Sequence, residues 1–209
     1  MTGSAVQARY GEGIASAGDV NGDGYSDIVV GASLDAADLG TVYAYYGGPS
    51  GLSTTASWVE VGDQGNSWFG VSLASAGDVD GDGYDDLLIG AMRYDEGGRM
   101  ECGAVFLYQG SPTGLGSAPS WIKYGDQAGS EFGMGLAFAG DVNGDGYSDM
   151  AIGAYQYMNG PSNSGRAYVY HGSVTGYAAS EDWMSMGVTA GYWGMSIASA
   201  GDVNGDGYG

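Results

Sequence analysis

Asp19-Val20-Asn21-Gly22-Asp23-Gly24-Tyr25-Ser26-Asp27 is a nine-residue acidic segment that recurs three more times along the chain. The second and third copies run from Asp78 to Asp86 and from Asp141 to Asp149, and a fourth begins at Asp202. Successive copies start 59, 63 and 61 residues apart. A repeat of this length is typical of an array of similar structural units.

Each acidic segment has the pattern of a cation-binding loop. Oxygen-bearing side chains stand at its first, third, fifth and ninth positions, a tyrosine whose backbone carbonyl can bind stands at the seventh, and glycines permit a tight curl. The expected ligands are Asp19, Asn21, Asp23, Tyr25 and Asp27; Asp78, Asp80, Asp82, Tyr84 and Asp86; Asp141, Asn143, Asp145, Tyr147 and Asp149; and Asp202, Asn204 and Asp206. The sequence therefore predicts three complete Ca²⁺ sites and a fourth that lacks its ninth-position ligand.

The loops differ from an EF-hand, which needs a bidentate glutamate at position 12. Here Val30, Ile89 and Ile152 occupy that position, and strands instead of helices are expected on either side. The carboxylate cage recurs without an adjacent histidine or other base, so the predicted role of the cation is structural. Asp85, the extra acid of the second copy, is expected to point to solvent.

The composition narrows the function classes. The chain has 209 residues, and its 25 acidic and 5 basic residues give a net charge of −20. Nucleic acids and anionic membrane surfaces are disfavoured partners, because binding them needs a basic footprint. A single cysteine, Cys102, excludes an intrachain disulfide. No apolar run approaches the ~20 residues of a membrane span, and residues 1–9 lack the apolar core of a signal peptide.

Four strand-like segments surround each of the three complete acidic loops, and the fourth loop has only the first of them. In each complete unit, an aromatic-Gly pair and a short strand of small residues precede the loop. An apolar run closed by Gly-Ala, an alternating strand and a strand opening with tryptophan follow it. Four antiparallel strands in a unit of about 60 residues predict an all-β fold built of β-propeller blades, with almost no helix. The expected single domain comprises units 10–68, 69–131 and 132–191 and a partial unit, 192–209.

Three complete units and one extra inner strand leave open how the ring closes, since propellers contain four to eight blades. One reading is closure by self-association, as a homodimer or a larger assembly, with residues 192–200 completing a neighbouring chain. Another reading is that the sequence is a piece of a longer protein. A third is an engineered propeller fragment that assembles into a ring.

In this order, the aromatic-Gly pair, the acidic loop, the Gly-Ala closure and the Gly-x-x-Tyr/Phe-x-Tyr strand resemble the FG-GAP repeat. This repeat is the unit of the integrin α-subunit propeller and its bacterial relatives. The resemblance covers residues 10–209 and implies that the loops bind Ca²⁺ and that the domain is extracellular or at the cell surface. The family's closing proline is absent, because Ser33, Met92 and Tyr155 follow the Gly-Ala pairs.

The expected function is a calcium-stabilised interaction or adhesion module that is not itself an enzyme. The loops opposite the acidic segments vary most, so a protein or glycan ligand is predicted there. The candidate contacts are Tyr94, Asp95, Arg99, Tyr155 and Tyr157. The alternative is an accessory, glycan-binding propeller of a secreted hydrolase or lyase. The recurring Trp58, Trp121 and Trp183 are expected to pack between blades.

Overall fold

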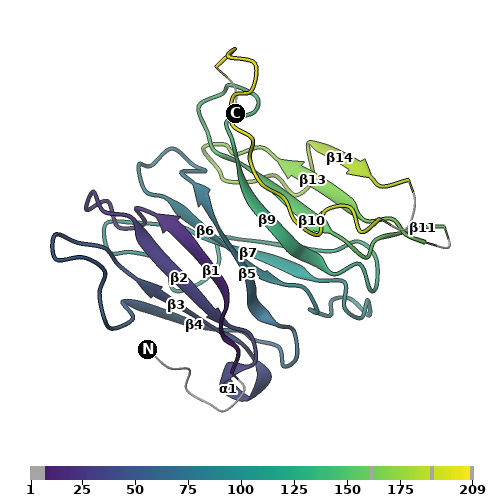
Figure 1. The fold of residues 1–209 in the computed structure, drawn as a ribbon, viewed down its shortest axis with the longest axis horizontal. Coiled ribbons are helices and arrows are strands. Elements are labelled where there is room, and N and C mark those ends of the chain that lie inside the picture. The colour runs from purple at the N-terminus through teal and green to yellow at the C-terminus, as the bar shows by residue number, and fades with distance from the viewer. Residues whose placement is uncertain (1–7, 161, 189–190, 208–209) are drawn as a thin grey trace.

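The computed structural model describes residues 8–160, 162–188 and 191–207, and strands dominate it (Figure 1). Each complete unit forms one four-stranded antiparallel sheet whose strand order follows the chain. The strands are β1 (Tyr10–Gly18), β2 (Asp27–Ala32), β3 (Thr41–Tyr45) and β4 (Trp58–Val61); β5 (Phe69–Gly77), β6 (Asp86–Ala91), β7 (Ala104–Tyr108) and β8 (Trp121–Tyr124); and β9 (Phe132–Gly140), β10 (Asp149–Ala154), β13 (Arg166–Tyr170) and β14 (Trp183–Met186). The predicted all-β blades are confirmed. Residues 1–7 and 208–209 of the predicted domain lie outside the described ranges.

Two short elements interrupt this pattern in the loops opposite the acidic segments. β11 (Met158–Asn159) and β12 (Ser162–Asn163) form a small hairpin. The four-residue element α1 (Asp35–Asp38) contains Ala36 and Ala37 in left-handed backbone conformations, so it is a tight turn and not a regular helix. The described part of the chain therefore agrees with the predicted scarcity of helix.

The three sheets stand side by side as an open array of blades (Figure 1). The strands β1, β5 and β9 are the inner strands, and each lies beside the next. The apolar runs form β2, β6 and β10, and every residue of β6 and β10 is buried. Burial on both faces explains why these strands read as continuous apolar runs instead of alternating ones.

Two hydrophobic cores fill the spaces between neighbouring sheets. Val29 and Val42 of the first blade pack with Leu87, Ile89 and Phe106 of the second. The other face of the second blade, through Leu88 and Val105, packs with residues of the third that include Met150, Ile152 and Tyr168. The middle blade therefore shares its two faces between two cores, whereas each outer blade contributes to one.

Glycines make the close contact between blades. A β-carbon on Gly31 would lie 2.0 Å from the carbonyl oxygen of Gly70 in the next blade, and one on Gly90 would lie 2.3 Å from that of Gly133. The aromatic-Gly pair of one blade is therefore packed against the Gly-Ala closure of the blade before it. Any larger side chain would separate the sheets.

The partial fourth unit lies against the third blade. The backbone N–H of Trp193 donates to the carbonyl of Ser164 at 3.1 Å, and Gly165 and Trp193 form a parallel bridge. Beyond this bridge, residues 194–207 form no regular strand, which differs from the expected inner strand. The reason is physical: none of the described segments offers this unit a second strand with which to pair.

Candidate metal centres

Side-chain hydrogen bonds shape each acidic loop from within. The carboxylate of Asp19 accepts from the backbone N–H groups of Asp23 and Gly24 at 3.1 and 2.8 Å. Asp78 and Asp141 accept equivalent bonds in the second and third loops. Gly22 and Gly24 have φ angles of 71° and 85°, a left-handed conformation that glycine adopts without strain. The curl predicted from the sequence is therefore present in all three complete loops.

The third and fifth positions also turn their oxygens inward. Oδ1 of Asn21 accepts from the N–H of Asp23, and Oδ1 of Asp23 accepts from that of Tyr25, both at 3.0 Å. Each is a side chain bonding to the backbone two residues ahead, a geometry that Asn and Asp favour. The loop therefore gathers several oxygen ligands around one point before any cation is considered.

The ninth-position aspartates are buried and join two parts of the blade. The two carboxylate oxygens of Asp27 accept from the N–H groups of Val20 at 3.0 Å and Gly47 at 2.8 Å. Asp86 and Asp149 make the matching pairs of bonds. The sequence predicted these residues as metal ligands, and the structure adds that they tie the acidic loop to the turn after the third strand.

Burial raises the pKa of all three ninth-position carboxyl groups. The effect is largest for Asp86, whose pKa rises to about 7, although the N–H groups of Gly110 and Val79 oppose the shift. Burial is also the main cause that raises the pKa of Asp80, and the negative charge of Asp82 raises it further. A divalent cation bound in this loop would favour the ionised form of these groups and relieve their repulsion.

The second loop gathers the tightest acidic cluster in the described part of the chain. Carboxylate oxygens of Asp78, Asp80 and Asp86 all lie within 4.8 Å of one another. Three hard oxygen donors at this separation fit the chemistry of Ca²⁺. Gln109, just after β7, donates its amide to Asp80 and so fixes that carboxylate at the rim of the cluster.

The acidic loops also bond to the following blade. The carbonyl of Asp19 accepts from the N–H of Asp85 at 3.2 Å, and that of Val20 accepts from Ser111 at 3.1 Å. The carboxylate of Asp85 accepts from the N–H of Asp19 at 2.8 Å. The prediction that Asp85 points to solvent is therefore wrong, because its side chain bridges two blades. The second loop repeats the backbone bonds, with Ser148 and Ser173 donating to Asp78 and Val79.

The fourth acidic loop has the same internal bonds without a blade around it. Asp202 accepts from the N–H groups of Asp206 at 3.1 Å and Gly207 at 2.8 Å. The loop is exposed throughout its described residues. Bonds from backbone N–H groups lower the pKa of Asp202. The loop thus presents ionised oxygens, but the described residues do not bring a ninth-position carboxylate to it.

The predicted ligand contacts lie in two separate loops of the opposite face. In the first, Tyr94 is only 9% exposed, and its hydroxyl donates to Asp63 at 3.2 Å; burial raises its pKa to about 12. Its neighbour Asp95 is exposed and accepts from the N–H of Glu101 at 2.6 Å. Arg99 pairs through its backbone with Glu96. Only the exposed members of this loop are free to meet a ligand.

In the second loop, the hydroxyl of Tyr155 donates to Glu131 at 2.5 Å. The ring of Tyr157 lies 3.6 Å from the guanidinium carbon of Arg166, whose Nη1 pairs with Asp126 at 3.2 Å. Tyr155 is therefore held by a residue of the preceding unit, and Tyr157 by Arg166 of its own blade. Ligand binding by the two loops stays a prediction.

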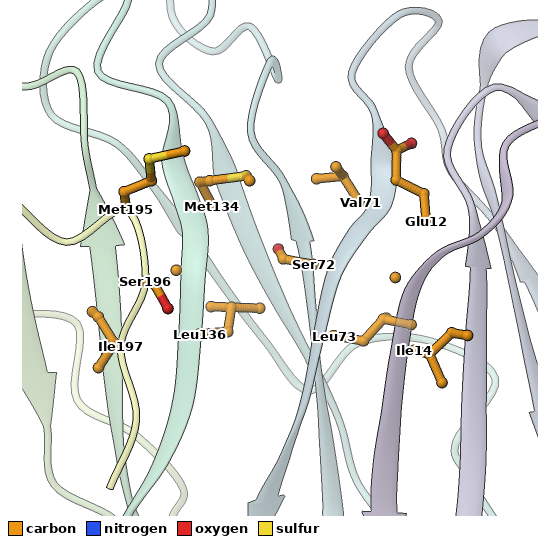
Figure 2. A pocket seen from close by; sticks show the side chains of 12 residues that line it. Glu12, Ile14, Val71, Ser72, Leu73, Met134, Leu136, Met195, Ser196 and Ile197 are labelled. Atoms are coloured by element: carbon orange, nitrogen blue, oxygen red, sulfur yellow. The ribbon is translucent and has the colours of Figure 1, made fainter. Parts of the chain in front are cut away.

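Sequence reasoning missed a hollow between the inner strands. It has a volume of about 230 Å³ and is lined by β1, β5, β9 and residues 195–197. Figure 2 shows side chains from these four segments around it, including Ser72, Leu136 and Ile197. The sequence feature that could have predicted this hollow is the small side chains of the inner strands, which leave space between them. Glu12 at its rim is bound to Arg9 and Ser33, which leaves little charge to attract a ligand.

The tryptophan series confirms packing between blades for its first two members. The indole of Trp58 donates to the carbonyl of Gly116 at 3.0 Å and meets the ring of Tyr108 edge-on at 5.2 Å. Trp121 donates to Ala178 at 3.2 Å and packs on Tyr170 in the same way. Trp183 is 52% exposed.

Comparisons with known proteins agree with these features. The family model described as FG-GAP repeat matches residues 10–45, 69–108 and 132–170. Integrin alpha-5 of Xenopus laevis is 34% identical over 167 residues, covering 74% of this chain and 15% of the relative. Integrin alpha-PS2 of Drosophila melanogaster is 37% identical over 168 residues, covering 76% and 11%. Human integrin alpha-IIb is 35% identical over 166 residues, covering 74% and 16%.

The chain thus spans a small fraction of the length of the relatives it matches. Among the residues that the structure describes, no helix has the length and apolar character needed to cross a membrane.

Proposed function

Because the chain belongs to the FG-GAP repeat family, we propose that it is a calcium-stabilised β-propeller interaction module of the adhesion type, without catalysis of its own. The carboxylate cluster of Asp78, Asp80 and Asp86 carries the proposal. It lies in a loop that repeats along the chain and bonds to the following blade. The integrin alpha relatives support the adhesion class.

Calcium would be held by the side-chain oxygens at loop positions 1, 3, 5 and 9 and by the carbonyl at position 7. The bound ion supplies positive charge. Hydrogen bonds of the protein hold the loop in shape. The first-position aspartate closes its curl, and the ninth-position aspartate joins it to the turn after the third strand. Loop carbonyls then hold the following blade. Three complete sites and a fourth, incomplete one are proposed.

The proposal is tested by thermal unfolding in 1 mM Ca²⁺ and in excess EDTA. A ligand that binds only the folded state stabilises it, so Ca²⁺ is expected to raise the melting temperature. Asp82→Asn should reduce this gain, because Asp82 is a fifth-position ligand. The matched control is Asp38→Asn, which removes one exposed negative charge outside the loops. Equal melting temperatures in both buffers would overturn the calcium proposal.

The proposed setting is extracellular or at the cell surface, on the strength of the integrin relatives. The proposed ligand is a protein bound by the loops opposite the calcium sites, around Asp95 and Arg99 in one blade and Tyr155 and Tyr157 in the next. Replacing Asp95 and Arg99 by alanine should weaken binding to such a protein and leave calcium binding intact. A saturable glycan site on this face, with no protein ligand, would favour the accessory role instead.

A further inference from the structure

A pocket of about 210 Å³ lies at the junction of the first and second blades, beside the outer strands β4 and β8. The first blade contributes Glu60 from β4 and Asp63 from the turn that follows it. The second blade contributes the rings of Phe69, Phe106 and Tyr108, each no more than 4% exposed. The pocket therefore combines aromatic walls with two carboxyl groups.

These two carboxyl groups have neutral hydrogen-bond donors but no basic partner. The hydroxyl of Tyr94 donates to Asp63 at 3.2 Å, and that of Tyr108 donates to Glu60. None of the ion pairs formed by the described residues includes either carboxylate. Burial raises the pKa of Glu60, and the bond from Tyr108 opposes the shift. Each carboxylate thus keeps acceptor capacity that a cation can use.

The same pocket occurs at the junction of the second and third blades, but there it is nearly filled, with a volume of about 30 Å³. The strand registers establish the match, because Glu60 pairs with Val42 as Lys123 pairs with Val105. The residues that line the second pocket stand at the matching positions of the next unit: Lys123, Tyr124, Gly125, Asp126, Phe132, Tyr168, Tyr170 and Glu181.

A lysine of the chain itself occupies the second pocket. Lys123 stands where the first pocket has Glu60. Its Nζ lies 5.6 Å from the ring centroid of Tyr170 and donates to the carbonyl of Ala179. An ammonium near an aromatic ring is attracted by the negative face of the ring. The second junction therefore shows an alkylammonium chain against the wall that Tyr108 forms in the first.

An arginine neutralises the other acid of the second pocket. Nη1 of Arg166 pairs with Asp126 at 3.2 Å, and its guanidinium carbon lies 5.6 Å from the ring centroid of Tyr168. Arg166 begins β13, and the matching first residue of β7 is Ala104. The first pocket thus has the acids and the rings of this arrangement, but a glutamate and an alanine stand at the positions of its two cations.

We propose that the pocket at the first junction binds the side-chain ammonium of a lysine from a protein partner. The ammonium lies against the ring of Tyr108 and pairs with Glu60 and Asp63, as Lys123 lies against Tyr170 in the second pocket. Charge-assisted hydrogen bonds and the aromatic wall both favour such a group. A Ca²⁺ ion is a poorer fit, because it requires six or more oxygen ligands and gains nothing from the rings.

This inference rests on the proposed function, since it names the chemical group by which a protein ligand is recognised. The pocket adjoins the proposed ligand-binding loops: the side chain of Gln64, next to Asp63, bonds to the backbone of Asp95 through both its amide nitrogen and its oxygen. A partner that contacts Asp95 can therefore reach the pocket with a long side chain.

The test is a titration of the full 209-residue chain in Ca²⁺ with Nα-acetyl-lysine N-methylamide, followed by the backbone amide signals in NMR. Saturable shifts are expected at residues 60–63 and 117–119, which line the first pocket, and not at residues 123–126 of the second. The norleucine analogue, which has the alkyl chain without the ammonium, should cause no saturable shifts.

Variants of Glu60 locate the contact. Glu60→Lys places an ammonium of the chain itself where Lys123 has one, so it should abolish binding of the lysine analogue. Glu60→Gln should weaken binding about tenfold, because it removes one charge-assisted contact. The matched control is Asp38→Asn, an exposed acid outside the pocket, which should bind as the parent chain does. Melting temperatures in Ca²⁺ verify that each variant is folded.

The inference is overturned by a parent chain that does not bind the lysine analogue, by equal binding of the norleucine analogue, or by binding that survives Glu60→Lys. Binding of n-butylammonium without binding of the lysine analogue would overturn the protein partner and indicate a free amine. The calcium proposal is read separately, from the melting temperature in Ca²⁺ and EDTA. If Ca²⁺ stabilises a chain that does not bind the lysine analogue, the inference fails and the proposed function stands.

Discussion

Residues 14–24 and 197–207 carry the same sequence but have different structures. Both acidic loops keep their shape: the first-position aspartate accepts from the fifth and sixth N–H groups at 3.1 and 2.8 Å in each. The strand before the loop forms only in the first blade, where β2 pairs with it. The curl of the loop is therefore encoded locally, and the strand depends on its neighbours.

The largest expected difference separates Asp86→Ala from Asp202→Ala. Asp86→Ala leaves the buried N–H groups of Val79 and Gly110 without their acceptor, which should cost about 3 kcal/mol of unfolding free energy. Asp202→Ala removes the same kind of bonds in an exposed loop that holds no blade, so global stability should stay unchanged. Urea unfolding in EDTA measures both. Equal losses would contradict the view that the fourth loop is structurally independent.

Gly90→Ala and Gly153→Ala place the same methyl group at two junctions. The first drives a β-carbon into the carbonyl of Gly133 between two complete blades, at a cost of about 2 kcal/mol. The second meets only Gly194 at the edge of the array. It should free residues 193–194 with little effect on overall stability. Faster hydrogen exchange at the Trp193 amide, with an unchanged urea midpoint, is the expected signature.

The pH dependence should distinguish the buried loop from the exposed one. The folded pKa of Asp86, about 7, lies above its unfolded value, because burial favours the neutral form. In EDTA its contribution to stability is therefore complete below about pH 4 and is lost as the pH rises through 7. Calcium requires the ionised form, so affinity at this loop should fall up to about tenfold per unit below pH 7.

Calorimetric titration with Ca²⁺ at pH 8 and pH 6 measures this effect. Asp86→Asn is the control, since it removes the titrating group and should flatten the pH dependence at its loop. A parent affinity that does not change between the two pH values would show that Asp86 does not set it. Asp202, whose pKa is lowered, should contribute no such dependence in this range.

The smallest contrast concerns the tryptophans. Trp58→Phe loses the bond to the carbonyl of Gly116, which should cost about 1 kcal/mol. Trp183→Phe should leave the unfolding free energy unchanged, because the Trp183 side chain is 52% exposed. A loss of similar size for Trp183→Phe would mean that its ring is already packed within one chain.

The sequence predicted the blades because each strand type carries its own pattern. The buried β6 reads as an apolar run, and the acidic loops read as oxygen ligands around glycines. The role of Asp85 could not be predicted, because it depends on the loop of another blade 66 residues away. The burial of Tyr94 was also missed: its ring packs on Phe106 and Tyr124, contacts that only the folded blade creates.

The ninth-position aspartates also make contacts that the sequence could not predict. Their spacing predicted metal ligands, but not the bonds by which Asp27 and Asp149 join the loop to the turn after the third strand. These bonds cross between segments some twenty residues apart. The local spacing of the residues therefore indicated the chemistry of the site. The contacts that support it could not be predicted, because they form only when the folded sheet brings the two segments together.

The hydrogen bonds from the first and second loops to the blade that follows each of them give the array a direction. A loop offers its first two carbonyl oxygens only forward along the chain, to residues such as Asp85 and Ser111. Linkage is reciprocal. The following blade, when packed against a loop, should therefore raise the affinity of that loop for its cation, and the bound cation should stabilise the contact between the two blades by the same free energy. In the described part of the chain, only the first two loops have a complete sheet ahead of them. Removal of the cations by a chelator should therefore separate the third blade from the second first, and the second blade from the first afterwards.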